Sequence, residues 1–71
     1  MRSLRASAVR TQLGIPRNTC ARLAGVNVHT FALFETDPDA VGDGKRVACS
    51  IVVDELRAAL ERITSRVQKG R

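Results

Sequence analysis

The chain has 71 residues and a net charge of +5, and 44% of its residues are hydrophobic. A chain of this length forms one small domain, residues 1–71, and is too short for a barrel or a doubly wound sheet, which excludes most enzyme architectures. Phe31 and Phe34 are its only aromatic residues, which argues against a stacking surface for single-stranded nucleic acid because such a surface needs exposed rings.

Glycine and proline residues divide the first half of the chain into segments whose apolar residues recur at helical spacing. We predict three helices, over about residues 3–13, 17–24 and 28–36. Ser3 and Asn27 are suitable N-caps for the first and third helices, because their side chains accept hydrogen bonds from the free N–H groups of a first helical turn.

A fourth, long helix is predicted over about residues 45–68, which contain neither glycine nor proline. Residues 37–44 precede it as a loop, a short turn of helix capped by Asp37-Pro38, or a small wing, and Gly42 and Gly44 form the break before the long helix. The apolar residues of the long helix repeat in a near-heptad seam. The members of this seam are Val52, Leu56, Ala59, Leu60, Ile63 and Val67.

The second half of the seam is expected to extend beyond what the preceding helices can cover, whereas the first half packs against them. An uncovered apolar stripe of this kind suits a second copy of the chain. We therefore predict that the helix over residues 45–68 is partly a dimerisation element, which acts through Leu56, Leu60, Ile63 and Val67. The charged residues around the seam are expected to form a solvated, ion-paired face.

The charges are unevenly distributed along the chain. Residues 1–34 contain five arginines and no acid, residues 35–44 contain four acids and no base, and residues 45–71 contain seven bases against three acids. A long stretch without a carboxylate indicates a surface that binds a polyanion such as nucleic acid.

Residues 17–36 have the pattern of a helix-turn-helix. Ala21 is small where two helices must cross closely, and Gly25 provides the positive φ that ends the first helix and makes the turn. Phe31 and Phe34, three residues apart, are expected to face the core. The whole chain is therefore predicted to be an all-α, small helical bundle.

This pattern resembles the Cro/C1-type helix-turn-helix family of phage and bacterial repressors, which bind operator DNA as dimers. The resemblance covers about residues 4–35 and rests on Leu13-Gly14, on Ala21 with Gly25-Val26-Asn27, and on Thr30-Phe31 with Phe34-Glu35. It implies a lambda-repressor-like DNA-binding domain in which Arg10 and Glu35 form a structural ion pair. The chain departs from the family after Glu35, where Asp37 replaces a usual glycine and one long helix replaces two short ones.

In a helix-turn-helix, the start of the second helix enters the major groove. The residues placed there are Asn27, Val28, His29, Ala32 and Leu33. The polar side chains of Asn27 and His29 are suited to hydrogen-bond base edges, and the apolar side chains are suited to contact thymine methyl groups. The basic residues expected to contact the DNA backbone are Arg17, Arg22, Lys45 and Arg46, and Arg17 is placed to reach either the backbone or a base edge.

The sequence thus predicts a sequence-specific double-stranded DNA-binding regulator, a homodimeric repressor of phage or mobile-element type that occludes a promoter at a palindromic operator. An alternative is a protein-interaction module, antitoxin-like or anti-effector, because the predicted recognition face is poor in hydrogen-bond donors. A weaker resemblance to MerR-like and excisionase-like DNA-binding modules rests on residues 25–30, on Phe34-Glu35 and on a Gly44-Lys-Arg46 wing.

No enzyme, cofactor, metal or small-molecule ligand is expected, because the chain has one histidine, no CxxC motif and no glycine-rich phosphate loop. Residues 1–13 do not have the composition of a signal peptide, and no apolar run is long enough to span a membrane. We therefore expect a cytoplasmic, nucleoid-associated protein of a bacterial or phage-infected cell. In such a reducing compartment, Cys20 and Cys49 are expected to be small core residues.

Overall fold

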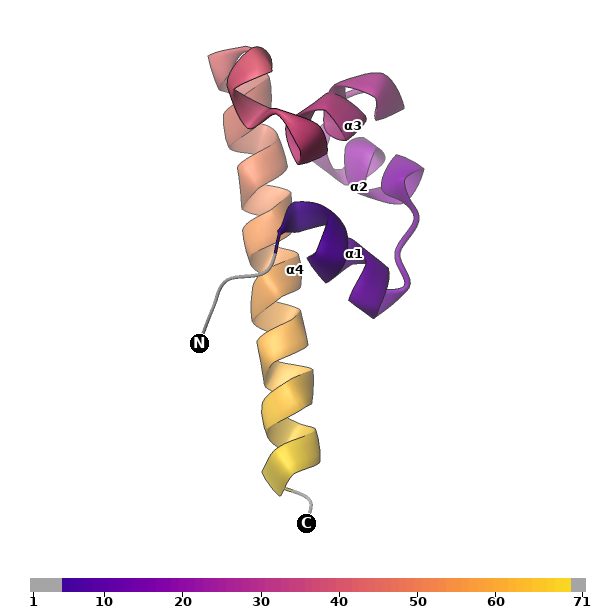
Figure 1. Ribbon diagram of the computed structural model, residues 1–71, viewed down its shortest axis with the longest axis vertical. Helices are drawn as coiled ribbons and strands as arrows, with labels where there is room; N and C mark the ends of the chain where they lie inside the picture. The colour runs from indigo at the N-terminus through magenta and orange to yellow at the C-terminus, as the bar shows by residue number, and fades with distance from the viewer. Residues whose placement is uncertain (1–4, 70–71) are drawn as a thin grey trace.

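The computed structural model describes residues 5–69, with the side chains of residues 5–66. In this range the chain is all-α, as predicted, and contains no strand. Its elements are α1 (Ala6–Leu13), α2 (Arg17–Ala24), α3 (Val28–Thr36), the 3-10 turn η1 (Pro38–Ala40) and α4 (Asp43–Lys69). Figure 1 shows α1, α2 and α3 gathered on one side of α4, whose C-terminal part continues past them. We call α1, α2, α3 and η1 together the head.

The first helix begins later than predicted. Arg5 has extended backbone angles (φ −63°, ψ 155°) and makes no side-chain capping bond, so α1 starts at Ala6 and the predicted start near residue 3 is wrong. The predicted cap Ser3 lies outside the described residues.

The second and third helices have the predicted bounds, because local signals define both ends. Gly14 and Gly25 have φ values of 72° and 74° and end α1 and α2 in the same way. In each case the N–H groups of the glycine and of the next residue donate to carbonyls of the last helical turn, a motif that requires the left-handed conformation glycine adopts most readily. Asn27 caps α3, and its Oδ1 accepts from the Thr30 N–H over 2.8 Å.

The fourth helix starts before Gly44 and not after it. Asp43 occupies its first turn, where a carboxylate is favoured by the partial positive charge of the helix N-terminus. The Gly42 carbonyl accepts from the Arg46 N–H over 2.8 Å, so the break in the chain lies at Gly42. The predicted break at Gly44 is wrong, because Gly44 lies within the first hydrogen-bonded turn of α4.

The core lies between the head and the N-terminal half of α4. Phe31 and Phe34, with ring centroids 5.9 Å apart, pack with the two cysteines and with small aliphatic side chains. Cys20 and Cys49 are free and fully buried, which confirms that they are core residues. Burial raises the pKa of both thiols. The seam residue Val52 is buried as predicted, and so is its neighbour Val53.

The length of the molecule is set by α4. The chain measures 43 × 22 × 16 Å along its principal axes, and a helix of 27 residues is about 40 Å long at roughly 1.5 Å per residue. None of the helices in residues 5–69 is both long and apolar enough to cross a membrane.

Candidate nucleic-acid interface

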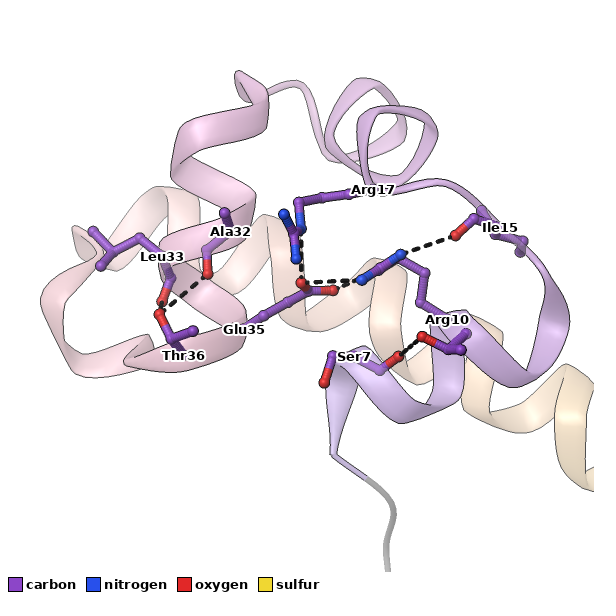
Figure 2. A network of polar contacts seen from close by, with 9 residues as sticks. Ser7, Arg10, Ile15, Arg17, Ala32, Leu33, Glu35 and Thr36 are labelled. Atoms are coloured by element: carbon purple, nitrogen blue, oxygen red, sulfur yellow. Dashed lines mark hydrogen bonds and ion pairs between the residues drawn. The ribbon is translucent and has the colours of Figure 1, made fainter.

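A buried carboxylate joins three parts of the head. Arg10 on α1 donates from Nε to Oε2 of Glu35 over 2.7 Å and from Nη2 to Oε1 over 3.4 Å, which forms the predicted pair in bidentate geometry. Arg17, the first residue of α2, donates from its own Nε to Oε1 over 3.0 Å. Arg10 also donates from Nη1 to the Ile15 carbonyl over 3.2 Å. Figure 2 shows both guanidinium groups converging on Glu35 near the C-terminal end of α3.

The burial of this network differs between its members. The Glu35 side chain is 2% exposed, Arg10 is 14% exposed and Arg17 is 46% exposed. A carboxylate removed from water is costly unless it is paired and hydrogen-bonded, and here two guanidinium groups meet that requirement. The network therefore fixes the orientation of α3 relative to α1 and to the start of α2.

The contact between Arg17 and Glu35 was not predicted, because Arg17 was assigned to DNA alone. A signal for it exists in the sequence. Glu35 is the first acid in the chain, so an inward-turned arginine of the first two helices has no other carboxylate within the head before Asp37. The bond uses one of the five N–H donors of the Arg17 guanidinium and leaves the Nη edge for another acceptor.

The outer face of α3 carries the residues predicted to contact bases. Phe31 and Phe34 point into the core, and the helical period places the other set on the opposite side of the helix. Val28 is 39% exposed and Leu33 41% exposed. The other members of this face are His29, which is exposed, and Ala32, which is half-buried.

The polar groups on this face are few. Asn27 is exposed, but its Oδ1 is engaged in the cap of α3, which leaves its amide N–H₂ group to donate. The Thr36 hydroxyl lies 3.2 Å from the carbonyl oxygens of both Ala32 and Leu33, so it is directed back to its own helix. Figure 2 shows this contact at the end of α3. His29 is therefore the main polar side chain that the face presents.

One large apolar residue of α2 lies at the surface: Leu23, in the last turn of the helix, is 66% exposed. The helical period that turns Cys20, Ala21 and Ala24 toward the core turns Leu23 away from it. Leu23 thus adds an exposed apolar side chain at the end of α2.

The predicted phosphate-binding residues have different surroundings. Arg22, in the last turn of α2, and Lys45, in the first turns of α4, are exposed. Arg46 donates from Nη2 to the Asp43 carboxylate over 2.6 Å and lies 3.7 Å from Asp39. Arg46 therefore belongs to an acidic neighbourhood next to η1.

The residues predicted to dimerise become progressively less covered along α4. Leu56 and Leu60 are half-buried, whereas Ile63 is 51% exposed. All side chains of residues 61–66 are exposed, and the side chain of Val67 lies outside the described residues. The structure thus leaves the second half of the seam without cover from its own chain.

Within residues 5–69, no group of three or more histidine, cysteine, aspartate or glutamate side chains is placed to hold a metal ion. A comparison with models of known protein families finds no match, and comparisons with curated proteins and with solved structures find none either. A functional interpretation therefore depends on the residues and their geometry.

Proposed function

We propose that the protein is a sequence-specific, double-stranded DNA-binding transcriptional regulator, and that α2 and α3 form its helix-turn-helix. The observation that carries this proposal is that the Glu35 carboxylate is buried and paired with two arginines. It is the only acid before Asp37 in the sequence, it is 2% exposed, and two arginines neutralise it. The described surface of α1, α2 and α3 therefore presents positive and neutral groups only, as a DNA-binding surface requires.

The shape of α2 and α3 supports the same proposal. A turn of residues 25–27 joins them, with a left-handed glycine at its start and a capping asparagine at its end. The ion-pair network holds α3 by its C-terminal end and leaves its outer face exposed. A rigid helix with an exposed outer face is what insertion into a major groove needs.

The roles of the side chains follow from their chemistry. His29 and the Asn27 amide group hydrogen-bond base edges, and the apolar residues Val28, Ala32 and Leu33 contact thymine methyl groups. The basic residues Arg17, Arg22 and Lys45 bind phosphates, and Arg46 joins them by exchanging its exposed carboxylate partners for a phosphate, since exposed ion pairs contribute little.

The resemblance to Cro/C1-type repressors adds the mode of action. A homodimer places two copies of α3 on a palindromic operator and occludes a promoter, as a regulator of phage or mobile-element origin that acts in the bacterial cytoplasm. The exposed residue Ile63 of α4, with the half-buried Leu56 and Leu60 and with Val67 in the same spacing, supplies the dimer contact.

The test is a fluorescence anisotropy titration against the DNA that adjoins the protein's own gene, with a scrambled duplex as control. We expect a preference of about a hundredfold or more for the native duplex, and an affinity that falls steeply between about 50 and 200 mM salt because bound phosphates release counterions. Equal and weak binding to both duplexes would refute the proposal.

Two variants separate base reading from phosphate binding. His29→Ala should reduce the preference for the native duplex, whereas Arg22→Ala should weaken binding to both duplexes and lower the salt dependence. The matched control is Arg62→Ala, which removes an equally exposed arginine from the part of α4 beyond the head. It should leave both affinities unchanged.

A second candidate function is a protein-interaction module of the antitoxin or anti-effector type. The exposed apolar residues Leu23, Val28 and Leu33 favour it, because apolar surface is read by proteins more readily than by DNA. A partner captured through this surface should bind with little salt dependence, and Leu23→Ser should abolish capture while leaving DNA binding intact.

A further inference from the structure

The C-terminal part of α4 carries an apolar seam that continues out of the core without a break. Cys49 and Val53 lie on the same side of the helix as the seam residues Leu56, Leu60 and Ile63. The five residues follow one another at alternating intervals of four and three, the spacing of a heptad. The first two are buried in the core, the next two are half-buried, and Ile63 is 51% exposed. The same packing surface thus changes from covered to uncovered where the head ends.

The spacing of the seam indicates what covers it. Heptad spacing keeps one stripe of a helix facing a second helix over its length, so the occupant is a helix and not a loop. Residues 61–69, which we call the overhang, are helical although the side chains of residues 61–66 are all exposed. The overhang continues a helix that the core already holds, so it presents its apolar side chains in a fixed helical arrangement. The overhang of a second copy has the required length, shape and apolar stripe.

We propose that two copies of the chain associate through their overhangs with the two α4 helices antiparallel. The position of the head excludes the parallel arrangement. The head lies on the seam side of α4, as the burial of Cys49 and Val53 shows, and Figure 1 shows it beside the N-terminal half of the helix. If two α4 helices packed in parallel through their seams, the two heads would occupy the same space at the same level.

The antiparallel arrangement has no such conflict. Each overhang lies against the other, and each head lies beyond the C-terminal end of the partner helix. The two-fold axis is then perpendicular to α4, near the level of Ser65, the midpoint of the overhang. A two-fold axis in this direction exchanges the two copies and makes their overhang surfaces equivalent.

This arrangement deepens the proposed function, on which its consequence for DNA rests. The two heads are at opposite ends of a rod, and the length of α4 sets the distance between them. The distance along the rod from the level of Cys49 in one copy to the two-fold axis at Ser65 is 16 residues, or about 24 Å at about 1.5 Å per residue. The same distance separates the axis from the equivalent level in the second copy, so the two heads are roughly 50 Å apart. The spacing of the two half-sites is therefore determined by α4.

Spin labels at positions 47 and 65 distinguish the two arrangements. The two positions are 18 residues apart, about five helical turns, so their side chains leave α4 in the same direction. Val47→Cys and Ser65→Cys variants each give one exposed label, and mock-labelled wild-type protein is the control because Cys20 and Cys49 are fully buried. Distances between labels are measured by pulsed electron paramagnetic resonance on the protein without DNA.

The antiparallel dimer separates the labels at position 47 by roughly 50 Å along the helix axis, whereas those at position 65 lie at the same level and are separated only across the two helices, by roughly 20 Å. Parallel helices give the same separation at both positions. Equal distances, or absence of any distance between labels because the protein is a monomer, would overturn the inference.

A matched pair of isoleucine variants tests which face of α4 is used. Ile63 and Ile51 are 51% and 55% exposed on the same helix, but only Ile63 belongs to the seam. In sedimentation equilibrium, Ile63→Lys should raise the dimer dissociation constant at least about tenfold, whereas Ile51→Lys should change it less than about twofold. Circular dichroism verifies that both variants remain helical. The opposite order of effects would contradict the inference.

The two proposals fail separately in these experiments. An antiparallel dimer that binds no DNA would leave this inference intact and refute the proposed function. A monomer that binds a single half-site specifically would refute this inference and the homodimer, and would leave the proposed sequence-specific DNA binding intact.

Discussion

Arg17 and Glu35 are joined by a hydrogen bond of 3.0 Å between Nε of the arginine and Oε1 of the glutamate. The pair links the first residue of α2 to the penultimate residue of α3, on a carboxylate that already holds Arg10. Arg17, one of the residues proposed to bind phosphate, is thus oriented by the same group that fixes the helices. Glu35 immobilises one edge of the guanidinium and leaves the other edge in solvent.

The first prediction concerns the carboxylate itself. Glu35→Gln should lower the free energy of unfolding by about 3–5 kcal/mol, because it leaves two guanidinium groups without their counter-charge at a buried site. Urea unfolding followed by circular dichroism measures this effect. Glu61→Gln, on an exposed glutamate of α4, is the control and should stay within about 0.5 kcal/mol of the wild type. Similar stability of both variants would show that the network is not structural.

The two arginines of the network should separate stability from DNA binding. Arg10→Ala is expected to be strongly destabilising, because Arg10 is 14% exposed and holds both Glu35 oxygens. Arg17→Ala should cost less than about 1 kcal/mol, since a half-exposed ion pair is screened by water. When both variants are compared at the same concentration of folded protein, Arg17→Ala should nonetheless reduce DNA affinity more than Arg10→Ala does. If Arg17→Ala binds DNA like the wild type, Arg17 is a structural residue only.

Substitution by alanine should change the stability of the protein in opposite directions at two glycines that both have open space around them. Neither Gly25 nor Gly44 has an atom within 4 Å of an added Cβ, but Gly25 has a φ of 74°. Gly25→Ala should therefore cost about 1–2 kcal/mol from backbone strain alone. Gly44→Ala, inside α4, should stabilise the protein by about 0.5–1 kcal/mol. Thermal unfolding of the two variants measures both effects, and a shift of the same sign would contradict the assigned conformations.

The buried thiols should make stability depend on alkaline pH. Burial raises the pKa of Cys20, an effect that Arg10 partly opposes and Glu35 reinforces, and burial alone raises the pKa of Cys49. A group that binds its proton more tightly in the folded state stabilises that state fully below its ordinary pKa, and this contribution is lost as pH rises through the raised value. The free energy of unfolding should thus fall above a pH of about 8.5.

Urea unfolding between neutral and alkaline pH measures this loss. Cys49→Ala, which keeps a small apolar group in the core, removes one of the two titrating thiols and should reduce the decline. A decline of the same size in the variant would assign the pH dependence to other groups.

The parts of the fold that could be predicted from the sequence are those with local causes. The ends of α2 and α3 depend on Gly25 and Asn27, whose effects operate within one turn, and the predicted bounds of both helices are correct. The start of α4 was misplaced because the sequence does not distinguish a glycine in the turn before a helix from a glycine in the first turn of the helix, which is where Gly44 lies. What distinguishes them is the chain direction after Gly42, which tertiary packing decides.

The candidate site shows the same division. The pairing of Arg10 with Glu35 was expected from a family resemblance, and the exposed face of α3 follows from helical period. The contact of Arg17 with Glu35 depends on how closely the start of α2 approaches the end of α3, a distance that no local pattern encodes. The exposure of Leu23 was likewise decided by which side of α2 the other helices cover.

The turns that end α1 and α2 also bear on how the chain folds. The hydrogen bonds at Gly14 and Gly25 join residues within a single helical turn, so these stops form without help from distant parts of the chain. Among the described helices, the contact of α1 with α4 closes the longest loop in the sequence. Closing a loop of this length costs more chain entropy than forming either of the local stops. We therefore expect docking of α4 onto α1 to limit the refolding rate.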